Sequence, residues 1–332
     1  MMPQLIGMHH VTAITSSAEK IYDFFTNILG LRLVKKTINQ DDINTYHLFF
    51  ADEVGSPGTD MTFFDFKGIS QAVHGNDELS RTGFRVASDK ALEYWLKRLN
   101  HYNVKNDGIT ELFGNKVLNF VDFDNQQYTI FSDELDQGVK SGKAWDKGPV
   151  PNEFAITGLG PAFINVSRIE SMHNLLTQVF LMRKSKEEGL YHLYEMGEGG
   201  NGGSVILYND FSKNNPSYQG YGGIHHIAFR VKDRAELDLW TNRLNSLGAP
   251  NSGHVDRFYF ESLYTRLYPN VLFELATDGP GFIDDEEDVT ILGETLALPP
   301  KFRDHRNYVE SVVRPINTVR SNKVFEKEYL DE

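Results

Sequence analysis

The chain has 332 residues, of which 40% are hydrophobic and 12% aromatic, so it can bury a substantial core and form about two to four structural units. Its formal charge of −13 argues against nucleic acids and anionic membranes as partners. Because cysteine is absent, disulfides, thiolate metal sites and a cysteine nucleophile are excluded, and any metal must be held by histidine and carboxylate side chains. No apolar run of about 18 residues and no signal-peptide pattern occurs, so we expect no membrane span and a cytoplasmic location. The composition is compatible with a homo-oligomer but does not determine the oligomeric state.

The first expected unit opens with a strand at Met8–Ile14 and continues into a helix at Ser17–Leu29. Apolar residues at helical spacing indicate the helix, and Gly30 is its expected C-terminal stop. Three strands are expected after the helix, at Arg32–Ile38, Thr45–Ala51 and Thr59–Phe66.

Three further segments repeat the order of strand, helix and strands. The second is expected to have a strand at Arg81–Ala87, a helix at Lys90–Tyr102 and strands near Glu111–Leu112, Lys116–Asp122 and Gln127–Ser132. The third is expected to have a strand at Gly160–Ser167, a helix at Ile169–Val179 and strands at Tyr191–Glu195 and Ser204–Tyr208. The fourth is expected to have a strand at His225–Val231, a helix at Arg234–Leu247 and strands at Arg257–Tyr268 and Val271–Thr277.

Each segment is therefore interpreted as a βαβββ unit, which alone forms a curved half-sheet with one unburied face. Units must pair to bury that face, so the sequence predicts an α+β fold of four βαβββ units in two barrel-like pairs. We expect an N-terminal domain (1–146) and a C-terminal domain (147–280) with two units each, then a tail (281–332). The acidic run Asp284–Asp288 in the tail is expected to be a solvated turn.

Two histidine pairs, His9–His10 and His225–His226, open the first and fourth units. A single such pair is usually structural, but two pairs at equivalent positions of a repeat can converge on one metal ion. Glu274 is a lone carboxylate in an otherwise apolar strand, and it needs a cation because a buried unpaired carboxylate costs several kcal/mol. Arg266 or a metal could supply that cation. One histidine from each pair with Glu274 would form a set typical of Fe(II), and units one and four should then pair around one cavity.

The repeated βαβββ pattern resembles the vicinal-oxygen-chelate superfamily, which includes glyoxalase I and extradiol dioxygenases. Within it, four motifs resemble the hydroquinone ring-cleaving dioxygenases, namely Leu33–Thr37, Tyr46–Thr59, Gly223–His226 and Tyr259–Ser262. The resemblance extends from about Met8 to the region of Pro299. It implies a vicinal-oxygen-chelate fold and an Fe(II)-dependent dioxygenase that opens an aromatic diol with O₂.

By the same resemblance, the Fe(II) ligands would be His10, His226 and Glu274. Roles next to the metal or the substrate are implied for His9, Thr12, His225, Arg257 and Tyr264. Strand alternation puts Thr12 on the face of His10, but it points His9 and His225 away, unless a bulge redirects them or they act through the ligands. Tyr264 could donate to a phenolate, and Arg257 could stabilise anionic oxygen. The other histidines show no such grouping and are expected to be structural or exposed; they are His47, His74, His101, His173, His192, His254 and His305.

Two other functions stay open at this point. A catechol-type extradiol dioxygenase would chelate iron through adjacent hydroxyls, although in that group the ligands usually come from the third and fourth units. A ligand-sequestering protein of the bleomycin-resistance kind would need a cavity but no metal ligands. A glyoxalase-type isomerase normally uses four protein ligands, whereas an apolar residue stands at the fourth position here.

Overall fold

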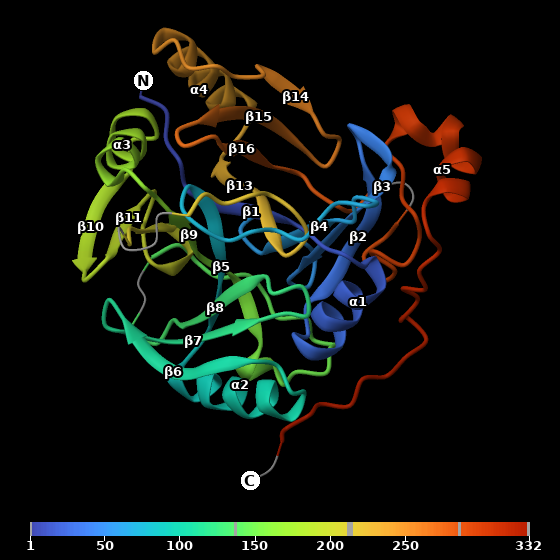
Figure 1. Cartoon of the computed structure of the whole chain (residues 1–332). Helices are drawn as coiled ribbons and strands as arrows, with labels where there is room; N and C mark the ends of the chain where they lie inside the picture. Colours follow the sequence, from blue (N-terminus) through green and yellow to red (C-terminus); the bar gives the residue numbers. More distant parts are fainter. Residues whose placement is uncertain (1, 136–137, 211–214, 285–286, 331–332) are drawn as a thin grey trace.

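The computed structural model describes residues 2–135, 138–210, 215–284 and 287–330, and within them two eight-stranded sheets form (Figure 1). The first sheet has the strand order β14-β15-β16-β13-β1-β4-β3-β2. Its strands are β1 (Gly7–Ile14), β2 (Arg32–Asn39), β3 (Asp42–Ala51), β4 (Asp60–Phe64), β13 (Gly223–Val231), β14 (His254–Asp256), β15 (Phe260–Leu267) and β16 (Val271–Pro280). Units one and four therefore share one sheet, which confirms the predicted pairing.

The second sheet combines units two and three in the order β10-β11-β12-β9-β5-β8-β7-β6. Its strands are β5 (Glu78–Val86), β6 (Asn106–Leu112), β7 (Asn115–Val121), β8 (Gln127–Ser132), β9 (Ile156–Asn165), β10 (Arg183–Glu188), β11 (Tyr191–Glu195) and β12 (Ser204–Tyr208). Each sheet thus takes one unit from either side of residue 146. The division into domains 1–146 and 147–280 accordingly stays a prediction about the chain, while the paired sheets confirm the predicted fold class.

The helices are α1 (Ala18–Asp23), α2 (Asp89–His101), α3 (Ile169–Asn174), α4 (Arg234–Ser246) and α5 (Arg306–Val312). Helices α1 and α3 continue as π-helical turns at Phe24–Ile28 and Leu175–Val179, and short 3₁₀ turns lie at Asn152–Phe154, Asn201–Gly203 and Pro300–His305. Helices α1, α2 and α4 begin where Ser17, Ser88 and Asp233 accept a hydrogen bond from a backbone N–H of the first turn.

Phe25, in the π-helical turn after α1, lies where the two sheets meet. Its ring centroid is 4.9 Å from that of Phe63 in the first sheet and 6.1 Å from that of Phe84 in the second. All three side chains are fully or almost fully buried in one continuous apolar core. Burial of such aromatic surface is a large favourable term in folding, so the two sheets form one packed body.

Strands β10 and β15 are among those that differ from the sequence-based expectation. Strand β10 was not predicted, because all its residues are polar and exposed and it therefore lacks the alternation of a half-buried strand. Strand β15 begins at Phe260 and not at Arg257, because Arg257–Tyr259 form a turn in which Phe258 has a φ of 72°. A short edge strand, β14, precedes this turn.

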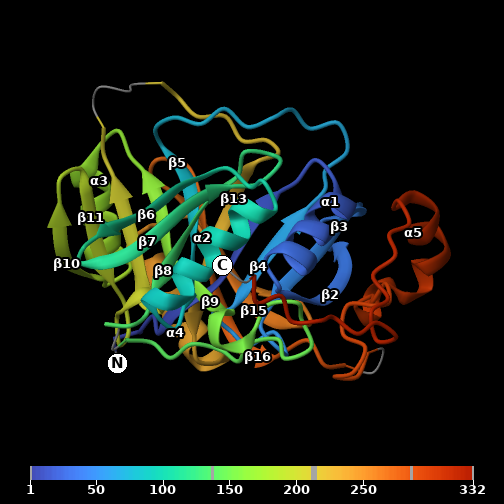
Figure 2. The ribbon, with the colours of Figure 1, turned by 90° about the horizontal axis from the view of Figure 1, so that it is seen from below.

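The acidic run in the tail was predicted to be a solvated turn, and this was wrong for Asp284 and Glu287, while Asp288 is exposed. Glu287 is buried, and its carboxylate lies 2.8 Å from the ammonium group of Lys35, which is itself fully buried. Asp284 contacts the same ammonium group at 3.2 Å. The ion pair connects the tail to β2. The tail then forms α5, runs along α1, and its described part ends beside α2 (Figures 1 and 2). There Glu328 pairs with Arg98 at 2.7 Å.

Candidate metal centre

Three neighbouring strands of the first sheet carry the candidate ligands: β1 carries His10, β13 carries His226 and β16 carries Glu274. In the ladder between β1 and β13, His226 lies opposite Thr12, and in the ladder between β13 and β16, Ala228 lies beside Glu274. Because residues two apart on a strand share a face, both histidines and the glutamate project from the same face of the sheet. The sheet thus brings together side chains that are 264 positions apart in the chain.

The three side chains converge at short distances. The Nε2 atoms of His10 and His226 lie 3.2 and 3.0 Å from Oε2 of Glu274 and 3.2 Å from each other. One ligand atom from each of the three residues lies within 4.8 Å of the ligand atoms of the other two. The three residues are 1%, 5% and 0% exposed, so the cluster is shielded from bulk water.

The donor set of this cluster fits a divalent cation. Glu274 Oε1 accepts a hydrogen bond from Ser262 Oγ at 2.6 Å, whereas Oε2 has no hydrogen-bond donor among the described residues. Burial alone would raise the pKa of Glu274, whereas positive charge at His10 and His226 holds that pKa well below its usual range. If both Nε2 atoms are unprotonated, a metal ion between the three side chains would have to supply that charge. A buried ionised carboxylate beside two imidazole nitrogens is the arrangement that a metal ion stabilises.

His9 determines the tautomer of His10. Its Nε2 lies 3.0 Å from the carbonyl oxygen of Thr277 and therefore carries the proton that is donated there. Burial, followed by the neighbouring His10, lowers the pKa of His9 to about 3, so His9 is neutral and its Nδ1 is an acceptor. The two Nδ1 atoms are 2.9 Å apart, so His10 donates from Nδ1 and keeps the lone pair of Nε2 for the metal position.

His225 stands in the same relation to His226. Their Nδ1 atoms are 2.8 Å apart, and burial, followed by His226, lowers the pKa of His225 to about 3. A neutral His225 whose Nδ1 accepts this hydrogen bond would leave Nε2 of His226 unprotonated. Simple alternation pointed His9 and His225 away from the ligands. A register shift between Met8 and His10 interrupts the ladder of β1 and β13, and both outer histidines touch the ligand rings.

A row of polar side chains leads from His226 to His47. Thr12 Oγ1 lies 3.0 Å from His226 Nε2 and 2.7 Å from Thr62 Oγ1, and Thr62 Oγ1 lies 2.9 Å from His47 Nε2. His47 was expected to be structural or exposed, and in the structure it also lines the cavity over the candidate ligands. Its place on β3 was visible in the sequence, since it alternates with the core residues Tyr46 and Leu48.

Tyr264 and Arg257 line the same cavity, which has a volume of about 360 Å³. Arg257 Nε donates to the Tyr264 hydroxyl oxygen at 3.0 Å, and the guanidinium pairs with Asp41 at 2.9 Å. Burial, followed by Glu274, raises the pKa of Tyr264 well above its usual range, so its hydroxyl stays protonated. Because the oxygen already accepts from Arg257, the O–H is left to donate into the cavity.

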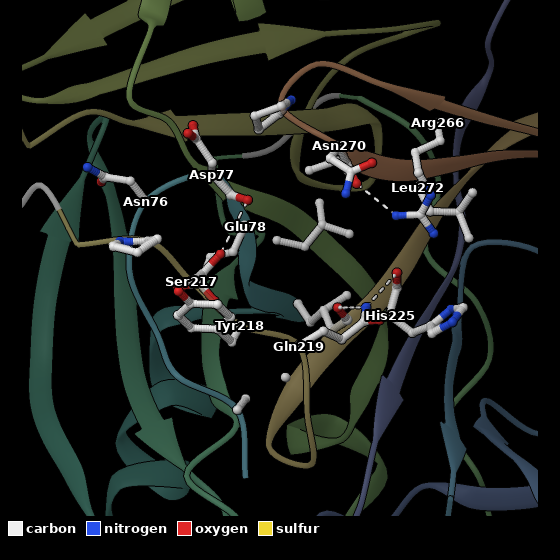
Figure 3. Close-up of a pocket in the computed structure, with 17 residues that line it drawn as sticks. Asn76, Asp77, Glu78, Ser217, Tyr218, Gln219, His225, Arg266, Asn270 and Leu272 are labelled. Atoms are coloured by element: carbon white, nitrogen blue, oxygen red, sulfur yellow. Dashed lines mark hydrogen bonds between the residues drawn. The ribbon is translucent and has the colours of Figure 1, made fainter. Parts of the chain in front are cut away.

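A second groove adjoins this cavity, and His225 and Leu272 line both (Figure 3). It has a volume of about 290 Å³ and polar walls, with Arg266, Asn270 and Tyr218 around it. Arg266 donates to the backbone oxygen of Asn270 at 2.8 Å and forms no ion pair with Glu274 in the described part of the chain. Arg266 and a metal ion were the two candidate cations for Glu274, and of these the metal ion fits the structure.

The chain is similar to known proteins over nearly its whole length. A model of the Glyoxalase/Bleomycin resistance protein/Dioxygenase superfamily matches residues 7–130. A Bacillus subtilis protein named "Putative ring-cleaving dioxygenase MhqA" is 39% identical over 317 residues, which cover 93% of this chain and 98% of the relative. The chlorohydroquinone/hydroquinone 1,2-dioxygenase of Sphingobium indicum is 30% identical over 298 residues, which cover 88% of this chain and 91% of the relative.

Solved structures agree with these matches. The crystal structure of a "putative dioxygenase" from Bacillus subtilis has a TM-score of 0.86 at 33% identity and covers 96% of this chain and 99% of its own. Glyoxalase I from Zea mays, at 11% identity and a TM-score of 0.58 over 82% of this chain and 92% of its own, shares the fold. The two sheets of paired βαβββ units are thus those of the glyoxalase and dioxygenase class. Within that class, the chain belongs to the family of ring-cleaving dioxygenases that includes these Bacillus and Sphingobium relatives.

Among the described helices, none is both long enough and apolar enough to cross a membrane.

Proposed function

We propose that this chain is an Fe(II)-dependent dioxygenase that opens the ring of a hydroquinone-type diol with O₂. The observation that carries the proposal is the buried convergence of His10, His226 and Glu274 on one face of a cavity large enough for one aromatic ring. Two imidazoles and one carboxylate leave other coordination positions of an octahedral iron open. The hydroquinone substrate named for the Sphingobium relative supports this choice of diol.

Fe(II) held by these three residues would supply the redox chemistry with O₂ that Zn²⁺, which has no redox chemistry, could not supply. His9 and His225 hold the ligand imidazoles in the tautomer that presents Nε2. Ser262 fixes the carboxylate through its hydrogen bond to Oε1. These three residues act by positioning the ligands and need not touch the substrate.

The remaining side chains of the cavity are suited to bind the diol and to form hydrogen bonds with its hydroxyl groups. Phe49, Phe260 and Leu272 provide apolar walls for the ring. Tyr264 donates a hydrogen bond to a diol oxygen. Arg257 orients the Tyr264 hydroxyl through its hydrogen bond, and the ion pair with Asp41 orients Arg257. Burial, followed by His10, lowers the pKa of His47 well below its usual range, so His47 stays neutral and can accept a hydrogen bond from a hydroxyl of the diol.

O₂ consumption by anaerobically Fe(II)-loaded protein tests the proposal with three isomers: hydroquinone, catechol and resorcinol. We expect sustained consumption with hydroquinone and loss of it in Glu274→Ala at the same added iron. Faster turnover of catechol would instead support a catechol-type extradiol dioxygenase. Tight binding of an aromatic compound without O₂ consumption would support a ligand-sequestering protein.

A further inference from the structure

The second sheet carries an arginine at the position that corresponds to His10. His10 lies eight residues before Ala18, the first residue of α1, and Arg81 lies eight residues before Asp89, the first residue of α2. The ladders agree, because His10 pairs with β4 in parallel and Arg81 pairs with β8, the corresponding strand of its own unit. Where the first sheet presents a metal ligand, the second sheet therefore presents a permanent organic cation.

Arg81 lines a cavity of about 270 Å³ in the second sheet. Its guanidinium carbon lies 5.2 Å from the ring centroid of Phe163, whose ring in turn lies 6.5 Å from that of Tyr191. The ring of Tyr208 follows at 4.9 Å from Tyr191. All four side chains line the cavity, which thus combines one cation with a row of aromatic rings. Its volume is close to the lower end of the range for small-molecule sites, about 300 Å³.

Among the described residues, the guanidinium of Arg81 donates hydrogen bonds only to neutral oxygens. Nη1 donates to Asn119 Oδ1 at 2.9 Å and to Thr129 Oγ1 at 3.3 Å, and Nη2 donates to Gln127 Oε1 at 3.1 Å. No carboxylate lies within ion-pair distance of it in the described residues. An arginine has five N–H donors in a planar fork, and three of them are used in these hydrogen bonds. The N–H of Nε and one N–H of Nη2 are therefore left to bind a ligand.

The charged neighbours of Arg81 in the cavity have partners of their own. Asp210 accepts a hydrogen bond from the Tyr208 hydroxyl at 3.2 Å, and His74 pairs with Glu78 at 3.1 Å. Burial lowers the pKa of Arg81, as expected for a desolvated cation that neighbouring anions do not fully compensate. An anion that enters the cavity would supply the missing countercharge.

We propose that this cavity binds a small planar carboxylate, which takes the two remaining donors of Arg81 and packs its apolar part against Phe163 and Tyr191. A carboxylate matches the fork because two parallel N–H groups meet its two oxygens. The aromatic row favours a flat, unsaturated ligand over a compact inorganic anion. The site is for binding alone, since it holds none of the metal ligands of the first sheet.

Fluorine NMR titration tests this site with 4-fluorobenzoate and its neutral counterpart 4-fluorobenzamide. Wild-type protein should bind the benzoate at least tenfold more tightly than the benzamide. A hydrogen-bonded charge pair of this kind corresponds to about a 10- to 100-fold loss of benzoate affinity in Arg81→Gln. Arg81→Lys keeps the positive charge but not the planar fork of N–H donors, so its affinity for benzoate should lie between those of the wild type and Arg81→Gln. Arg257→Gln is the matched control in the first sheet and should bind benzoate as the wild type does.

Equal affinity for the two ligands would overturn the proposal, as would unchanged benzoate binding in a folded Arg81→Gln. Loss of binding in Arg257→Gln alone would also overturn it, because the ligand would then occupy the metal cavity. Arg81 also braces β7 and β8, so folding of each variant is checked by circular dichroism. Should neither Arg81 variant fold, the preference for benzoate together with the Arg257→Gln control still decides the outcome.

Discussion

Replacing His9 with leucine should weaken metal binding without removing a ligand. The substitution removes the hydrogen bond to Nδ1 of His10 and the hydrogen bond to the carbonyl of Thr277. Without a fixed acceptor at Nδ1, His10 can place its proton on Nε2, which is the atom that must bind the metal. His10→Ala, in contrast, deletes the ligand itself.

The size of the effect follows from two contributions. One neutral hydrogen bond contributes about 0.5–1.5 kcal/mol. Equal sharing of the His10 proton between its two nitrogens would cost about 0.4 kcal/mol, which is RT ln 2. Their sum, roughly 1–2 kcal/mol, corresponds to about a 5- to 30-fold loss of affinity. This overlaps the 10- to 100-fold loss that is typical for residues that orient a metal-bound histidine.

Competition for Fe(II) against a colorimetric chelator, under strictly anaerobic conditions, measures this loss. His173→Leu is the matched control, because His173 is hydrogen-bonded to Tyr194 at 2.9 Å in the third unit, which carries no candidate ligand. It should retain the wild-type affinity. If a correctly folded His9→Leu also retained it, the tautomer argument would be refuted and His9 would have to act on the substrate or on packing alone.

Three further changes test the substrate cavity, a buried carboxyl group and the attachment of the tail. Tyr264→Phe should keep its iron but lose about 100-fold in turnover at matched iron loading, since one preorganised donor is removed; unchanged turnover would leave Tyr264 as a packing residue. Burial raises the pKa of Asp122 to about 7, so between about pH 4 and 7 the folded state binds more protons than the unfolded state, and this residue lowers stability by about 1.4 kcal/mol per unit of rising pH. Urea unfolding of Asp122→Asn should lack that part of the pH dependence, and parallel curves for the two proteins would contradict the assignment. Lys35→Met should cost about 3–5 kcal/mol because it leaves the buried Glu287 without its cation, whereas Lys35→Met combined with Glu287→Gln should cost clearly less; equal losses in chemical denaturation would argue against the ion pair as the cause.

The paired half-sheets and the convergence of the triad were predictable from the sequence because both depend on local patterns. A repeated βαβββ order sets the strand pairing, and strand alternation puts one histidine of each pair on the face of the cavity once units one and four are joined. The choice of His10 and His226 from the two pairs came from the resemblance to the ring-cleaving dioxygenases. The identity of the metal and the roles of these three residues as its ligands remain proposals.

Other features were not predictable because they depend on contacts between distant segments. Glu287 looked solvated in its acidic run, but its partner Lys35 is 252 positions away. Ser262 and His47 join the site only through the register of β15 on β16 and of β3 on β4. The turn of His9 toward His10 depends on an irregularity in the ladder with β13 that no local pattern reveals.

We propose above all that His10, His226 and Glu274 hold an iron ion at which an aromatic ring is opened with O₂. Mass spectrometry of the product formed from hydroquinone under ¹⁸O₂, by anaerobically Fe(II)-loaded protein, tests it most directly. We predict a ring-opened product that contains one whole molecule of O₂, with label in its new carboxylate, and no such product from Glu274→Ala. Unlabelled benzoquinone as the product, or equal ring opening by Glu274→Ala, would contradict the claim.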